Sequence, residues 1–227
     1  TSSINAFSAY SMYGLGELRT PGTLQTRSMG GVGVGMRNAA AVNLLNPAAY
    51  SAVRPKSFLF DFGLEGQCFY NSQKYYGQTL NTSYYTVNFH DIAFQLPIAK
   101  HLGLGFSLTP YSSVGYRMKQ EVDDDEIWGN IGRVQYQWDG DGDVTEVKLG
   151  LGWEIFRGFS IGIAAQYYWG DIQRIYKTAI LENITGGGLI ADATGTETYS
   201  VSRFKGQFGV QWSPISNRRR ILRIGRA

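Results

Sequence analysis

The stretch LGLGFSLTPYSSVGY, residues 102–116, alternates large apolar residues with small or polar ones until Pro110 interrupts it. Successive side chains of a β-strand point to opposite faces of the sheet, so every second residue from Leu102 to Leu108 would share one apolar face. Proline lacks the N–H that a ladder hydrogen bond needs, and within sheets it is confined to edges and bulges. The stretch therefore predicts an amphipathic strand whose pairing is disturbed near Pro110.

The same alternation recurs from Ser57 onward. Its apolar faces are formed by Phe58, Phe60, Phe62 and Leu64; by Val147, Leu149, Leu151 and Trp153; by Phe159, Ile161 and Ile163; and by Phe204, Phe208, Val210 and Trp212. Strands of roughly 12 to 18 residues, joined alternately by tight turns and long polar loops, are typical of an outer-membrane β-barrel. A soluble β-sandwich is the alternative, but its strands are shorter. The predicted fold class is an all-β, transmembrane antiparallel barrel.

Composition excludes several other classes of protein. With 14% aromatic and 17% charged residues and 29 glycines among 227 residues, the chain is not expected to be disordered. No apolar run is long enough for a membrane-spanning helix. The basic run NRRRILRIGR, residues 217–226, lies in an alternating stretch without an aromatic recognition motif, so nucleic acid is not an expected partner.

Two regions are expected. Residues 1–55 are rich in glycine and alanine and predict a compact, loop-rich leader whose one or two helical turns end at Asn46-Pro47. Residues 56–227 carry six complete strands and the start of a seventh in RRILRIGRA, residues 219–227. An open strand edge in lipid would leave backbone groups unsatisfied, so we expect further strands beyond Ala227.

No constellation of residues predicts catalysis, a cofactor or a metal site. Nucleophile, base and acid residues lack a recognisable spacing, so an enzyme is not expected. WDGDGDV, residues 138–144, places aspartates as a calcium loop would but lacks the required glycine and glutamate, and it predicts a solvated turn. The ionisable residues predicted to face the lumen, as paired wall groups, are Asp61, Glu65, Arg117, Glu146, Lys148 and Arg203.

A second irregularity lies close to the first. The apolar phase changes between Tyr85-to-Phe89 and Ile92-to-Leu96, across His90 and Asp91. A phase change of one residue predicts a β-bulge.

Three segments together resemble the N-terminal half of the FadL/TodX family of outer-membrane transporters: MGGVGVG (29–35), RNAAAVNLLNPAAYSA (37–52) and IAFQLPIAKHLGLGFSLTPYSSVGY (92–116). The resemblance implies a barrel of about fourteen strands, of which residues 56–227 are the first half, truncated in the seventh strand. It also implies an N-terminal hatch over residues 1–55 that carries the motif Asn46, Pro47 and Ala48. In that family the third strand is kinked, which makes Pro110, with His90 and Asp91, the expected lateral opening.

The resemblance implies uptake of hydrophobic small molecules, such as long-chain fatty acids, by lateral diffusion through the wall of a barrel. The protein would lie in the outer membrane of a Gram-negative bacterium, with the ligand and the membrane lipids as its partners. The alternative is a scaffold of the same fold that binds protein partners, like PorV of type IX secretion. For Pro110, the alternative is a strand that ends there, with YSSVGY as a loop.

Overall fold

The computed structural model describes residues 8–75, 78–122, 133–182, 193–217 and 220–226. The N-terminal part holds four short elements: η1 (Ala9–Met12), β1 (Glu17–Leu18), α1 (Leu24–Ser28) and η2 (Pro47–Ala52). Seven strands follow: β2 (Leu59–Tyr75), β3 (Gln78–Ala99), β4 (Leu102–Val122), β5 (Arg133–Phe156), β6 (Phe159–Glu182), β7 (Ala193–Asn217) and β8 (Arg220–Arg226).

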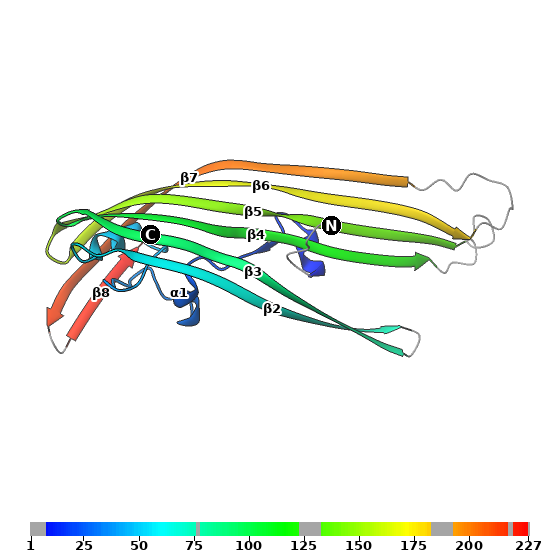
Figure 1. Ribbon diagram of the computed structural model, residues 1–227, viewed down its shortest axis with the longest axis horizontal. Helices are drawn as coiled ribbons and strands as arrows, with labels where there is room; N and C mark the ends of the chain where they lie inside the picture. The colour runs from blue at the N-terminus through cyan, green and yellow to red at the C-terminus, as the bar shows by residue number, and fades with distance from the viewer. Residues whose placement is uncertain (1–7, 76–77, 123–132, 183–192, 218–219, 227) are drawn as a thin grey trace.

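The seven strands form one antiparallel sheet in sequence order from β2 to β8. The sheet curls into a trough, and the N-terminal segment lies inside its curve (Figure 1). The strands expected from Ser57 onward are therefore present, and the all-β fold of a partial barrel is confirmed. Within the described parts of the chain, no helix is long and apolar enough to cross a membrane.

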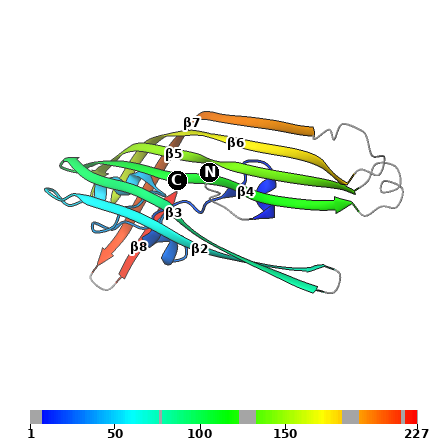
Figure 2. The same cartoon turned by 45° about the vertical axis from the view of Figure 1, so that its right-hand side comes forward.

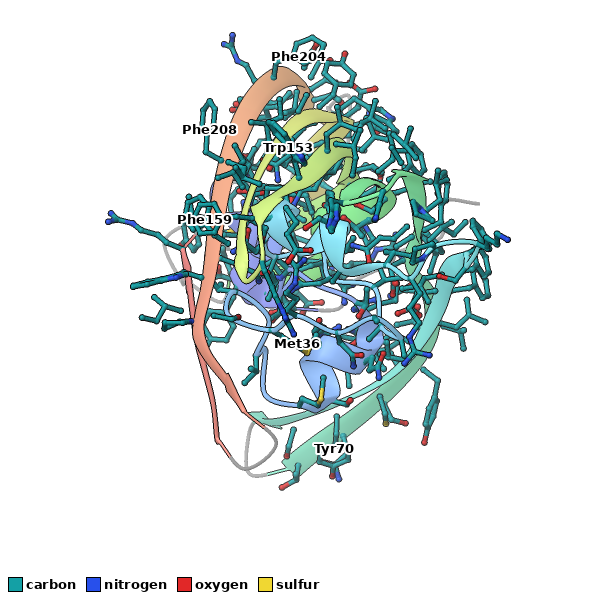
Figure 3. All side chains as sticks on the ribbon, turned by 90° about the vertical axis from the view of Figure 1, so that its left-hand side faces the viewer. Met36, Tyr70, Trp153, Phe159, Phe204 and Phe208 are labelled. Atoms are coloured by element: carbon teal, nitrogen blue, oxygen red, sulfur yellow. The ribbon has the colours of Figure 1, made fainter. Side chains whose placement is uncertain are left out.

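The alternation in the sequence separates the two faces of the trough. Phe204 and Phe208 on β7 project away from the interior (Figure 3), with 82% and 77% of their surface exposed. On β5, Lys148 lies on the concave face and is buried, whereas Leu149 and Leu151 are exposed on the convex face. The convex face thus carries an apolar band that no part of the described chain covers.

On β5 the apolar band covers only the half of the strand next to the tight turn. On the convex face of β5, Val147 is followed by Thr145 and then by Asp143, Asp141 and Asp139. The aspartates were expected in a turn, and that prediction is wrong, because β5 pairs with β4 and β6 throughout this stretch. Strand alternation, and not a loop, explains their spacing.

The segment around Asn46 also differs from the sequence prediction. Asn46 and Pro47 do not end a helix; they begin η2, with Asn46 as its N-cap and Pro47 in the first helical position. The Asn46 side-chain oxygen accepts a hydrogen bond from the Ala48 N–H at 3.0 Å. Asparagine is a favoured N-cap, and proline is favoured directly after it because its missing N–H would have no helical partner there.

The concave face of the sheet has glycines where η2 approaches it. A Cβ atom at Gly103 would overlap the Tyr50 carbonyl, and one at Gly162 would overlap Pro47. Gly152 and Gly209 likewise face the backbone of η2 and its cap. Tyr50 is fully buried as a result, and burial raises the pKa of its phenol. The wall therefore accepts the backbone of η2 only because side chains are missing from these positions.

We predict that Gly162→Ala loosens this packing. The added methyl group overlaps Pro47 and the Ala48 nitrogen, and overpacking of this kind costs about 1–3 kcal/mol. Gly206→Ala on β7 is the matched control, since a Cβ atom there meets nothing within 4 Å. Unfolding of the detergent-solubilised protein in urea, followed by tryptophan fluorescence, measures the difference. Equal midpoints for the two variants would contradict the packing argument.

Candidate functional site: the inner segment and the split between β3 and β4

The sheet splits along its length between β3 and β4. These strands pair only from Ala99 to Ile92 and from Leu102 to Leu108, whereas β4 pairs with β5 as far as Val122. Beyond Ile92 the β2–β3 hairpin diverges from β4, as two views show (Figures 1 and 2). The alternative in which Pro110 ends its strand is therefore wrong, because β4 continues past it.

Two β-bulges lie where the split begins. The β2–β3 register shifts between Gly63 and Leu64, which leaves His90 as the extra residue, so the bulge predicted there is present. His90 and Asp91 are both buried, and their side chains contact each other. The second register shift lies between Pro110 and Ser112 in the β4–β5 pair. The irregularities predicted from the sequence thus meet at one place, although the role of Pro110, His90 and Asp91 as an exit stays a prediction.

The bulge beside Pro110 reverses the faces of β4 and corrects one predicted lumen residue. Before it, even-numbered residues such as Leu108 are on the convex face; after it, even-numbered Tyr116 is buried on the concave face. Arg117 therefore lies on the convex face, 58% exposed, where its Nε donates to Asp139 at 3.0 Å. The prediction that Arg117 faces the lumen is wrong because the alternation was continued through the bulge.

The inner segment, defined as residues 8–56, occupies the edge of β4 that β3 leaves. In β1, Glu17 pairs with Ser113 and Leu18 with Ser112. The Arg19 N–H donates to the Tyr111 carbonyl at 2.8 Å, directly beside the bulge. Further along, the Ser8 N–H donates to the Gly115 carbonyl at 3.1 Å. The backbone of β4 is thus hydrogen-bonded by the inner segment in place of β3.

Arg19 connects the two sides of the split. Its guanidinium donates to Ser113 Oγ at 3.3 Å and to the Glu65 carboxylate on β2 at 3.4 Å. Arg27 in α1 binds the same carboxylate at 3.0 Å. Arg19 and Pro110 line both a cavity of about 430 Å³ inside the trough and one of about 200 Å³ between β3 and β4. The Arg19 side chain therefore lies at the partition between the two cavities.

Polar side chains of the wall hold the carbonyl groups of the inner segment. Lys148 Nζ donates to the Leu44 carbonyl at 2.8 Å, and Gln207 donates to the Leu45 carbonyl at 2.9 Å. Gln211 donates to the Val34 carbonyl at 3.0 Å. A buried loop must have its backbone groups satisfied, and here β5 and β7 supply the donors.

The predicted hatch motif lies at the centre of this packing. Asn46, Pro47 and Ala48 are all fully buried or nearly so. The Asn46 amide donates to the Val34 carbonyl at 2.9 Å and to the Val210 carbonyl of β7 at 3.3 Å. The motif thus joins the inner segment to the wall, while its role as a hatch stays a prediction.

The other predicted lumen residues lie on the concave face. Glu146 is 3.8 Å from Lys148 and accepts a hydrogen bond from Gln166 at 3.1 Å. Asp61 is half-buried on β2, near the inner segment, and Arg203 is exposed on β7 on the same face as Gln207. The larger cavity is lined by several of these polar groups, with Lys205 at its edge.

Sequence reasoning missed the arginines of the inner segment. Arg37 Nη1 donates to Ser160 Oγ at 2.8 Å, and its Nη2 lies 3.2 Å from Glu154 on β5. Arg19 and Arg27 bind Glu65 in the same way. A signal was present, since residues 29–56 contain arginine and lysine but no aspartate or glutamate. Buried cations in that segment require acidic partners elsewhere, here on the wall.

The sequence model of the BamG family matches residues 2–224. The chain belongs to the BamG family. A crystal structure of a Pseudomonas aeruginosa FadL homologue is similar to this BamG-family chain, with a TM-score of 0.53 and 13% sequence identity. The match covers 88% of this chain and 50% of the homologue, so the chain spans half the length of that protein. No curated protein matches.

We predict that, in this BamG-family chain, Asn46→Ala weakens the attachment of the inner segment to the sheet. The variant loses the cap of η2 and the bonds to Val34 and Val210, which together correspond to roughly 1–3 kcal/mol. Asn38→Ala is the matched control, because Asn38 is exposed on the same segment and accepts one local bond from Ala40. Limited proteolysis should cleave the Asn46 variant faster within residues 8–56. Cleavage at the control's rate would show that Asn46 does not anchor the segment.

Proposed function

We propose that this BamG-family protein is an outer-membrane barrel that serves as a scaffold for protein partners in outer-membrane assembly. The match of the BamG family model over residues 2–224 supports the assembly context. The fold shared with a FadL homologue supports the outer membrane of a Gram-negative bacterium as the location.

The convex face supports insertion into a membrane. From Val147 to Ile155 on β5 the apolar residues extend about 27 Å along the strand, close to the roughly 25 Å apolar band of outer-membrane barrels. Trp153 near the tight turn and Trp169 at the other border fit the aromatic girdles of such a band. Past this band the outward residues of β5 are polar, and those of β6 include Asp171, Gln173 and Lys177.

The observation that carries the scaffold proposal is the fastening of the inner segment across the split. A transporter of this type needs an open way from the lumen to the lipid, and here β1 and Arg19 occupy it. The cavity inside the trough has a mixed lining, in which Lys148, Glu146 and Gln166 lie beside Leu44, Leu45 and Tyr111. The charged groups in this lining make burial of an alkyl chain there less favourable, because they would lose contact with water. With the inner segment fastened across the split, the outer surfaces remain as sites for partners.

Passage of a hydrophobic small molecule, such as a fatty acid, is the second candidate. The loss of β3–β4 pairing beyond Ile92 favours it, together with the cavity of about 200 Å³ beside Pro110. Lateral diffusion would then require β1 to leave the edge of β4.

We predict that the native protein copurifies with the machinery that assembles outer-membrane barrels. Membranes are solubilised in mild detergent, the protein is isolated by an affinity tag, and copurifying proteins are identified by mass spectrometry. Depletion of the protein should lower the amount of folded barrels in the outer membrane, because the scaffold would be missing. An unrelated tagged outer-membrane barrel is the control. Recovery of the protein alone, with unchanged barrel assembly on depletion, would contradict the scaffold.

We predict that Pro110→Val leaves uptake of a labelled fatty acid unchanged. Pro110 disturbs β4, but β1 already pairs with the adjacent edge, so the restored N–H opens or closes no route. Pro97→Val on β3, in the paired part of the wall, is the control. Uptake is compared in cells with equal surface amounts of each variant. Slower uptake in the Pro110 variant alone would favour lateral passage over the scaffold.

A further inference from the structure

A separate cavity lies at the tight-turn end of the trough. It has a volume of about 450 Å³ and lies between the inner segment, the β3–β4 turn and β5. Its lining includes Arg37 and Arg54 from the inner segment, Lys100 and His101 from the turn, and Glu154 from β5. Nothing in the scaffold or passage proposals uses this cavity.

The positive groups of this cavity exceed its negative ones. Glu154 is the one acidic residue in the lining, and its carboxylate lies 3.2 Å from Arg37 and 3.4 Å from His101. It also accepts the Gly158 N–H at 3.1 Å. Arg54 and Lys100 are exposed, and neither forms an ion pair with any residue that the structure describes. Two cations therefore face the cavity without a carboxylate of their own.

The surroundings have the same charge. Lys56 precedes β2, and Arg157 lies in the β5–β6 turn. The half of β5 that lies away from the tight turns carries Asp139, Asp141 and Asp143. A positive potential at the turn end would attract negatively charged partners and speed their association.

We infer that the cavity bounded by Arg37, Arg54, Lys100 and His101 binds a carboxylate-rich segment of a partner protein on the tight-turn side of the barrel. The inference rests on the proposed scaffold and names the chemistry of its partner. Arginine presents paired N–H donors that match a carboxylate, and lysine adds a point charge. The cavity is lined by the inner segment and not by the apolar band, which favours a peptide from solution over a lipid headgroup.

The test measures binding of synthetic peptides to the complete protein in detergent. A fluorescent peptide rich in glutamate should bind, and binding should weaken as salt is raised because the contacts are ionic. The matching peptide with glutamine in place of glutamate should not bind. Arg54→Gln and Lys100→Gln should each weaken binding by about tenfold, as expected for a lost charged hydrogen bond. Fluorescence anisotropy gives the dissociation constants.

Arg157→Gln is the matched control, because it removes the same charge from an exposed turn outside the cavity. It should change the affinity less than twofold. Equal weakening by all three variants would show that binding depends only on the net charge of the protein, which would contradict a specific site. Equal binding of the glutamine peptide would contradict it as well. Vesicles containing phosphatidylglycerol form a further arm: competition by these vesicles that depends on Arg54 and Lys100 would assign the site to lipid phosphate and overturn the peptide.

Failure of the cavity inference can be distinguished from failure of the scaffold proposal. Copurification with assembly proteins from cells that carry Arg54→Gln and Lys100→Gln tests the two together. If the wild-type protein copurifies with partners but binds no glutamate peptide, the scaffold holds and the cavity inference fails. If the peptide binds but no assembly protein copurifies, the scaffold fails while the cavity still binds carboxylates.

Discussion

The packing of a polypeptide backbone directly against the inner surface of a sheet is the constraint on which the rest of this structure depends. Residues Asn46 to Ser51 contact the wall where Gly103, Gly152 and Gly162 leave no side chains. Such contact brings peptide groups out of water, so each must find a hydrogen-bond partner. Donors such as Lys148 and Gln207 supply them. Different positions on the same strands therefore serve two needs of the buried segment. Glycines provide the space for its backbone, and long polar side chains provide its hydrogen-bond partners.

The packing of η2 against the sheet also positions the chain that lies at the split between β3 and β4. Because η2 fixes one end of the inner segment, the chain before it reaches the edge of β4, where β1 pairs with Ser112 and Ser113. The bulges at His90 and Tyr111 lie where β3 and β4 cease to pair, and β1 pairs with the edge of β4 that β3 leaves. The ion pair between Arg19 and Glu65 then joins this edge to β2. Strand β2, strand β4 and the inner segment are thus held together beside the two bulges.

Alternation in the sequence was sufficient to predict that the strands exist and that a bulge lies at His90, because side-chain period reports directly on backbone geometry. It underestimated their length, since β3 to β7 have 21 to 25 residues. It failed for Arg117, since a bulge inserts one residue and reverses every face beyond it. It failed for the aspartates from Asp139 to Asp143, whose composition resembles a turn although both neighbouring strands pair with them. The ion pairs of Arg19 and Arg37 join residues far apart in sequence. The lack of acidic residues near Arg37 indicates that its partner lies elsewhere, but no local pattern identifies that partner as Glu154.

The two ends of the strands differ in a way that bears on function. Near the tight turns the convex face is apolar and the rim is basic, whereas the far half of β5 is acidic on its outer face. A membrane that covers the apolar band leaves the basic rim on one side and about 40 Å of β5, between Arg133 and Thr145, on the other. A difference in charge between the two ends would let each surface favour partners of the opposite charge. With the interior held by hydrogen bonds and ion pairs, these two surfaces are where a partner can bind without displacing the inner segment.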